Sequence, residues 1–237
     1  MDKKSNRLRL TKKILLTCFV LLIVGSILIF GYLYYQKGEE RIQAEDVQRT
    51  LEELTKAANM IDSIREEAPK ELREVHDFLV KQNQEGEFKL YQISPKLKGK
   101  VLMYHGVKTK GIFVDASVIL KPELWIPIFY HEVAHNYWHS QNPVKTFEEF
   151  QTQLFDSENY AYTVEAQAWN LVMKHYPIEE GGLRTELEQR LLKIYTRDTE
   201  IYNAMAKGNP DARELWNKII AEDIKYQKEY QGLLLGE

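Results

Sequence analysis

The sequence predicts an α+β fold that is mostly helical, with an N-terminal transmembrane helix followed by a domain that holds a small antiparallel sheet. Residues 14–35 form a long apolar run without charges. Short segments rich in β-branched and aromatic residues lie between Gln82 and Pro122, and segments with helical periodicity lie on both sides of them. The predicted parts are a cytoplasmic basic segment (1–13), a transmembrane anchor (14–35), juxtamembrane helices (36–83) and the main domain (84–237).

The apolar run ILLTCFVLLIVGSILIFGYLYY, residues 14–35, is long enough to cross a membrane as a helix. Residues 1–13 carry six basic side chains and one acidic one. The positive-inside rule therefore predicts a cytoplasmic N-terminus, with residues 36–237 on the extracytoplasmic side of the cell membrane. No pair of small residues suited to cleavage follows the run, so an uncleaved single-pass signal-anchor is favoured over a signal peptide.

Charge and cysteine content exclude several classes of function. The chain has a net charge of −3, of which residues 1–13 contribute +5, so residues 36–237 carry −8. An acidic domain repels phosphate backbones, which argues against nucleic-acid binding. The single cysteine, Cys18, lies within the apolar run, so the main domain has neither a disulfide framework nor a cysteine metal ligand.

Residues 38–67 are highly charged but carry an apolar stripe at alternating spacings of four and three, formed by Val47, Leu51, Leu54, Ala58 and Ile61. This stripe predicts either a short coiled-coil stalk or one helix that lies on the domain, and its short length favours the second. Pro69 predicts the start of another helix, because proline fits a first helical turn.

Three strands are predicted next, in the segments EFKLYQIS, GKVLMYHG and GIFVDASVIL, with antiparallel pairing. From Pro122 onward the pattern is helical again. The predicted helices lie near residues 122–140, 145–175, 182–207 and 210–232.

The segment FYHEVAHNYWH, residues 129–139, carries the chemistry. His131 and His135 are four residues apart, so on a helix their imidazoles lie on one face and can bind one Zn²⁺ ion. Glu132 is rotated about 100° from His131, where it is placed to act as a general base on a zinc-activated water. A packed helix with incidental histidines is the competing interpretation, but the chance occurrence of this spacing is low.

This segment resembles the active-site helix of the zincin metallopeptidases, in which the two histidines bind zinc and the glutamate is the base. The metzincin branch is excluded, because Trp138 and Gln141 stand where its motif has glycine and histidine. In the glutamate-zincins a glutamate from a following helix completes the site, often with alanine three residues later.

Both Glu158 (with Ala161) and Glu165 (with Ala168) fit that pattern. A longer likeness, from GIFVDASVI to EAQAWNLVMKHYP, resembles the ImmA/IrrE-type metallopeptidases and favours Glu165 as the third metal ligand. His139 lies two turns beyond His131, too far to share the ion comfortably.

The remaining polar residues are less specific. An oxyanion donor is expected near the metal, and the sequence offers Tyr160, Tyr162, His139 and His175 as candidates. The last two histidines, His76 and His105, are predicted to be surface or loop residues.

The leading hypothesis is a membrane-anchored zinc metallopeptidase that hydrolyses a peptide or protein substrate, with His131, His135 and Glu165 as zinc ligands and Glu132 as base. The alternative is a non-catalytic membrane-anchored binding or sensor module. An intramembrane protease is excluded, because the charge-free stretch around the motif, residues 124–130, is too short to span a bilayer. Neither the substrate nor the oligomeric state can be read from the sequence.

Overall fold

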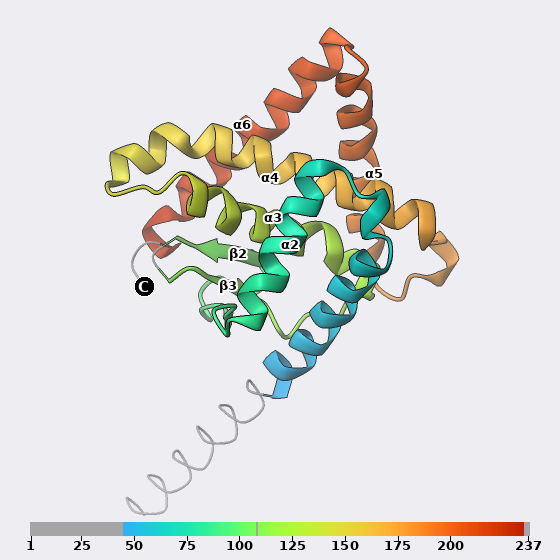
Figure 1. Ribbon diagram of the computed structural model, residues 1–237, viewed down its shortest axis with the longest axis horizontal. Coiled ribbons are helices and arrows are strands. Elements are labelled where there is room, and N and C mark those ends of the chain that lie inside the picture. The colour runs from blue at the N-terminus through green and yellow to red at the C-terminus, as the bar shows by residue number, and fades with distance from the viewer. Residues whose placement is uncertain (1–44, 108, 235–237) are drawn as a thin grey trace, which may run out of the picture. The chain divides into compact units, whose positions relative to one another are not determined.

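The computed structural model describes residues 45–107 and 109–234 (Figure 1). The described residues from Asp46 onward form a compact unit of their own. The helices are α2 (Lys70–Gln84), α3 (Pro122–Gln141), α4 (Phe147–His175), α5 (Glu186–Ala206) and α6 (Pro210–Leu234), with two short 3-10 helices, η1 (Arg65–Glu67) and η2 (Glu180–Gly182). Residues 46–63 are also helical. The four helices predicted after residue 122 are therefore present.

Local sequence signals explain where the long helices begin. Pro122 occupies the first turn of α3, where its missing N–H leaves no intrahelical bond unmade. α4 and α5 each begin with a capping box, formed by Thr146 with Glu149 in α4 and by Thr185 with Glu188 in α5. In each box the threonine side chain accepts from the glutamate N–H, while the glutamate side chain accepts from the threonine N–H.

The sheet is mixed, which corrects the antiparallel sheet predicted from the sequence. Its strands are β1 (Leu90–Gln92), β2 (Met103–Gly106) and β3 (Gly111–Val114), in the order β1-β3-β2. β2 and β3 form an antiparallel hairpin, whereas β1 pairs in parallel with β3. The chain turns back between β1 and β2, so these two strands run in opposite directions. β3 runs opposite to β2 and is therefore parallel to β1, which pairs with the edge of β3 that β2 does not occupy. The hairpin also leaves β2 at an edge of the sheet.

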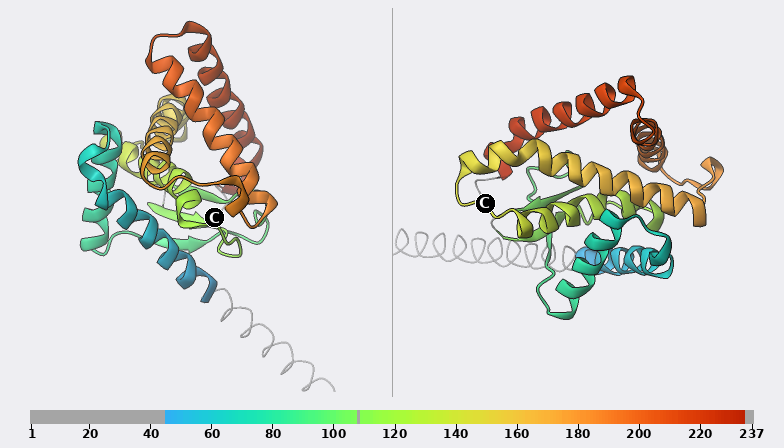
Figure 2. Two further views of the ribbon diagram at one scale, coloured as in Figure 1. Left: turned by 90° about the vertical axis from the view of Figure 1, so that its right-hand side faces the viewer. Right: turned by 45° about the horizontal axis from the view of Figure 1, so that its top comes forward.

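α3 lies at the centre of the fold, with β2 and β3 on one side and α4 on another (Figure 1). Ala161 and Ala168 of α4 are fully buried in the same core as Ala134 of α3, and small side chains allow helices to approach closely. α5 and α6 form a helical hairpin, and α6 runs back along α4 (Figure 2). This arrangement brings α6 to the same region as the histidines of α3.

The helical segment 46–63 packs into this unit through an apolar stripe. Leu54, Ala57 and Ile61 are buried in the core together with Leu72 and Val75 of α2. Of the two sequence-based alternatives, the packing agrees with a helix that lies on the domain rather than a separate stalk. Residues 46–84 thus belong to the same compact unit as the sheet.

The predicted membrane-anchored architecture is not supported. Within residues 45–107 and 109–234, no helix has both the length and the apolar character required to cross a membrane. Even α3, with its buried face, has a charge-free run only at 124–130, between Glu123 and the motif. The predicted anchor at 14–35 lies outside the described residues. The described structure therefore gives no basis for the transmembrane helix, the signal-anchor or the extracytoplasmic location.

Candidate metal centre

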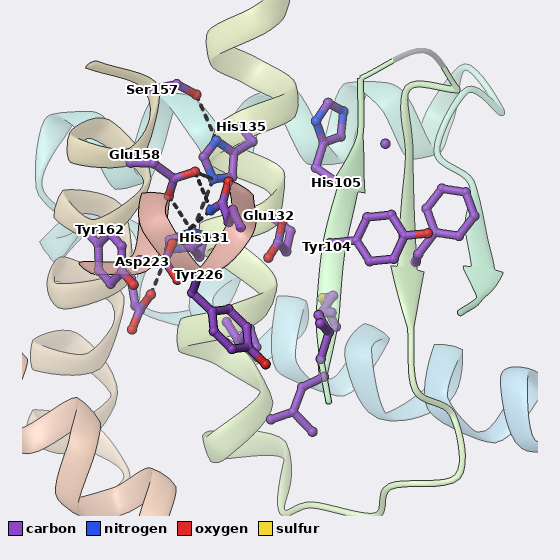
Figure 3. Close-up of a pocket in the computed structure, with 18 of the residues that line it drawn as sticks. Tyr104, His105, His131, Glu132, His135, Ser157, Glu158, Tyr162, Asp223 and Tyr226 are labelled. Atoms are coloured by element: carbon purple, nitrogen blue, oxygen red, sulfur yellow. Dashed lines mark hydrogen bonds and ion pairs between the residues drawn. The ribbon is translucent and has the colours of Figure 1, made fainter. Parts of the chain in front are cut away.

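A cavity of about 560 Å³ lies where β2, α3, α4, α5 and α6 converge. Cavities of this size are typical of sites for small ligands. The α3 residues His131, Glu132 and His135 line it and are buried (Figure 3). The helical spacing predicted from the sequence therefore turns the polar face of α3 toward a cavity rather than toward a dry core.

Three side chains converge closely in this cavity. The Nε2 atoms of His131 and His135 are 3.1 Å apart. Glu158 of α4 brings Oε2 to 3.4 Å from Nε2 of His131, and Oε1 to 3.4 Å from Nε2 of His135. This buried group could hold a metal ion, since its ligand atoms all lie within 4.8 Å of one another.

The outer nitrogens of the two imidazoles are held by partners on α4. Nδ1 of His131 lies 2.8 Å from Oε2 of Glu165, and Nδ1 of His135 lies 2.8 Å from Oγ of Ser157. An ionised carboxylate only accepts hydrogen bonds, so Nδ1 of His131 is the donor to Glu165, and Nε2 is the nitrogen that faces the cavity. Such outer partners fix the ring orientation that metal binding requires.

The electrostatics of the group favour a cation. Burial opposes the charge on Glu158, but His135 and His131 outweigh it and hold the pKa of Glu158 well below its ordinary value. Burial likewise opposes a charged His131, yet the carboxylates of Glu158 and Glu165 beside its two ring nitrogens raise the pKa of this histidine well above the usual range. Two carboxylates thus stabilise positive charge at His131.

Glu132 lies outside this group but faces the same cavity, beside β2 (Figure 3). Burial raises its pKa, whereas the nearby His131 and His135 favour its charged form. Glu132 is only 7% exposed, and a carboxylate buried in this way needs compensating partners. Glu132 therefore lies in the same cavity as the three converging side chains without being one of them.

For the third ligand, the structure groups Glu158, not Glu165, with the two histidines. Glu165 instead contacts the outer nitrogen of His131. Glu158 and Glu165 are two turns apart on α4, and only the side chain of Glu158 reaches the gap between the two Nε2 atoms. The sequence-based preference for Glu165 therefore gains no support from the geometry.

The candidate oxyanion donors divide into two pairs. Tyr162 and His139 line the cavity, and the ring of Tyr162 packs edge-on against His131 at 4.7 Å. Tyr160 packs instead against Tyr137 and Trp138. His175 lies at the end of α4 and contacts Glu67, away from the cavity.

The two histidines predicted to be surface or loop residues are placed differently. His76 is buried, with Nδ1 2.6 Å from the hydroxyl of Tyr130 and Nε2 3.2 Å from Oδ1 of Asp62. His105 on β2 lines the cavity, and its ring stacks on His139 at 5.9 Å. The alternation of side chains along β2 could have indicated that His105 shares the inward face of Met103.

Sequence reasoning also missed two residues of α6. Asp223 and Gln227 line the cavity, and Nε2 of Gln227 donates to Oε1 of Glu158 at 2.8 Å. Burial and the neighbouring Glu158 raise the pKa of Asp223 to about 6. No local motif distinguishes these residues from the other polar positions of an amphipathic helix.

The stability of the metal-free protein is expected to depend on His139 below neutral pH. Burial, with a contribution from His135, lowers the pKa of His139 to about 4. The unfolded chain takes up this proton near pH 6.5 and the folded chain only near pH 4, so stability falls as the pH is lowered between these values. Between pH 7 and pH 5, the melting temperature of the His139→Phe variant should fall less than that of the unsubstituted chain. Both are measured with a chelator present, so that no metal is bound. Equal losses would contradict a half-buried His139 that stays neutral in the folded chain.

The chain was compared with protein-family models, with curated proteins and with solved structures, and none of them matches it.

Proposed function

We propose that this chain is a zinc-dependent metallopeptidase in which His131, His135 and Glu158 bind the metal and Glu132 is the general base. The observation that carries the proposal is the convergence of the three donor side chains, with a buried carboxylate beside them. A cavity of about 560 Å³ next to this group offers room for part of a peptide.

The spacing of the donor atoms supports zinc as the metal. Ligands bound at about 2.0 to 2.1 Å to a tetrahedral zinc ion lie about 3.3 to 3.4 Å from one another. Here the two Nε2 atoms are 3.1 Å apart, and each lies 3.4 Å from one oxygen of Glu158, Oε2 for His131 and Oε1 for His135, so the carboxylate faces both imidazoles at a comparable separation. Two histidines and one glutamate are also a known ligand set of catalytic zinc, which keeps one coordination position open for substrate or water.

Bound zinc would lower the pKa of a water molecule and polarise the carbonyl group of the substrate. Glu132 would accept the proton of the attacking water and then deliver it to the leaving amine. Glu165 and Ser157 would keep the two imidazoles aimed at the metal.

The edge strand β2 supports an extended peptide as the substrate. Within the described part of the chain, β2 pairs only with β3, and residues 103–106 of β2 line the cavity. An extended peptide can add to such an edge through main-chain hydrogen bonds. Its scissile bond would then lie between β2 and α3, where Glu132 is located (Figure 3).

The first test is the zinc content of the purified full chain after extensive dialysis, measured by plasma mass spectrometry. We expect one zinc ion per chain, lost in His131→Ala, because the lost ligand weakens binding by more than the 10- to 100-fold typical of outer-sphere partners. Absence of zinc from the folded, unsubstituted chain would overturn the proposal. Zinc that survives the His131→Ala change would place the metal elsewhere.

A non-catalytic metal-binding module is the competing function. It would need the same three ligands, but it would give no reason for Glu132 to stay buried in the cavity at an energetic cost. The two functions differ in what the loss of the Glu132 carboxylate does while the metal remains bound.

A further inference from the structure

The last helix, α6, reaches into the candidate metal centre. Asp223, Tyr226 and Gln227, which span one turn near the end of α6, line the cavity beside Glu158. Figure 3 shows Asp223 and Tyr226 on the same side of the cavity as Glu158 and Tyr162. The function proposed above gives these α6 side chains no role.

Gln227 joins two carboxylates through one amide group. Its Nε2 lies 2.8 Å from Oε1 of Glu158 and 2.8 Å from Oδ2 of Asp223. An amide nitrogen carries two hydrogens, and an ionised carboxylate only accepts, so both hydrogens are used and the amide has one sensible orientation. The chain Asp223 to Gln227 to Glu158 is therefore a defined hydrogen-bond relay.

The two carboxylate oxygens of Glu158 have different surroundings. Oε1 is occupied by Gln227, whereas Oε2 is buried and has no hydrogen-bond partner among the described residues. A buried carboxylate oxygen that accepts no hydrogen bond is costly, and a cation bound between this oxygen and the imidazoles would reduce that cost. Oε2 is also the oxygen that lies 3.4 Å from Nε2 of His131.

A second contact holds α6 against the same part of α4. The indole N–H of Trp216, which is 1% exposed, donates to Oδ1 of Asn159 at 2.9 Å. Asn159 directly follows Glu158, so α6 is fixed to α4 next to the proposed ligand. α6 is therefore attached to α4 by a buried contact at Trp216 as well as by Gln227.

We propose that Gln227 is a positioning residue that orients Glu158 toward the metal, and that Asp223 holds Gln227 in place. The inference rests on the proposed zinc site, but it concerns metal affinity and coordination rather than hydrolysis. It assigns α6 to the metal centre, although α6 contributes no residue to the motif of α3.

The test compares zinc dissociation constants of the full chain and of Gln227→Met, by competition with a chromophoric chelator. Methionine matches the length and shape of glutamine but lacks the donor. We expect binding about 10- to 100-fold weaker, as for other outer-sphere partners. The matched control is Gln151→Met, at an exposed glutamine of α4, which should leave the affinity unchanged.

Cobalt substitution separates positioning from general stability. The visible absorption of Co²⁺ reports the number and arrangement of its ligands, so Gln227→Met should alter this spectrum. Its metal-free melting temperature should stay near that of the unsubstituted chain. Unchanged zinc affinity together with an unchanged cobalt spectrum would overturn the inference and leave the proposed function standing. An unsubstituted chain that binds no zinc would overturn both.

Two substitutions of Asp223 give a second measure if Gln227→Met folds poorly. Asp223→Asn and Asp223→Ala both remove the charge, but only asparagine keeps an oxygen that can accept from Gln227. We expect weaker zinc binding by Asp223→Ala than by Asp223→Asn. Equal affinities would show that Asp223 does not act through Gln227.

Discussion

Replacing Glu132 with glutamine is expected to lower kcat by about 10²- to 10⁴-fold, the usual contribution of a general base, without loss of zinc. Glutamine has nearly the same size, so the packing of α3 stays intact. The amide cannot accept the proton of the attacking water. The three residues that converge on the metal position do not include Glu132, so zinc should stay bound.

The measurement is turnover of a mixture of internally quenched peptides by zinc-loaded protein. Glu123→Gln, in the first turn of the same helix and outside the cavity lining, is the matched control and should keep full activity. A Glu132→Gln variant that turns over peptide at the unsubstituted rate would exclude Glu132 as the base.

The parts of the site that the sequence could predict are those set by local geometry. Residues four apart on a helix share one face, so the spacing of His131 and His135 was enough to pair them. The same rule placed Glu132 off that face. α3 packs against both β2 and α4. The polar side chains of its motif can therefore point into the fold only because a cavity lies beside them.

Features that depend on how distant segments pack were not predicted. Glu158 and Glu165 are seven residues apart and share a face of α4, so periodicity cannot rank them. The position of α4 along α3 decides which carboxylate reaches the two Nε2 atoms. Gln227 lies 69 residues from Glu158, and nothing in the sequence of α6 marks it.

The sheet shows the same limit. Three short strands in succession predicted an antiparallel arrangement, but β1 pairs in parallel with the far edge of β3. Strand pairing is set by the path of the connections, which sequence patterns of three or four residues do not encode. This pairing leaves β2 as the edge strand beside the cavity, which is the feature that supports an extended substrate.

Exchanging the two glutamates of α4 for glutamine is expected to separate the metal ligand from its supporting residue. Glu158→Gln should abolish tight zinc binding, because the amide carries no charge and Glu158 is the carboxylate that lies 3.4 Å from both Nε2 atoms. Glu165→Gln should weaken binding by about 10- to 100-fold at most, because the amide oxygen can still accept from Nδ1 of His131.

The comparison is decisive because both changes remove one negative charge from the same helix and the same cavity. Zinc affinities would be measured by chelator competition, with Glu148→Gln, at an exposed position of α4, as the control for a distant charge. A greater loss in Glu165→Gln than in Glu158→Gln would identify Glu165 as the third ligand, as the sequence alone predicted. The larger loss in Glu158→Gln would show that α4 presents Glu158 to the metal and Glu165 to the back of His131.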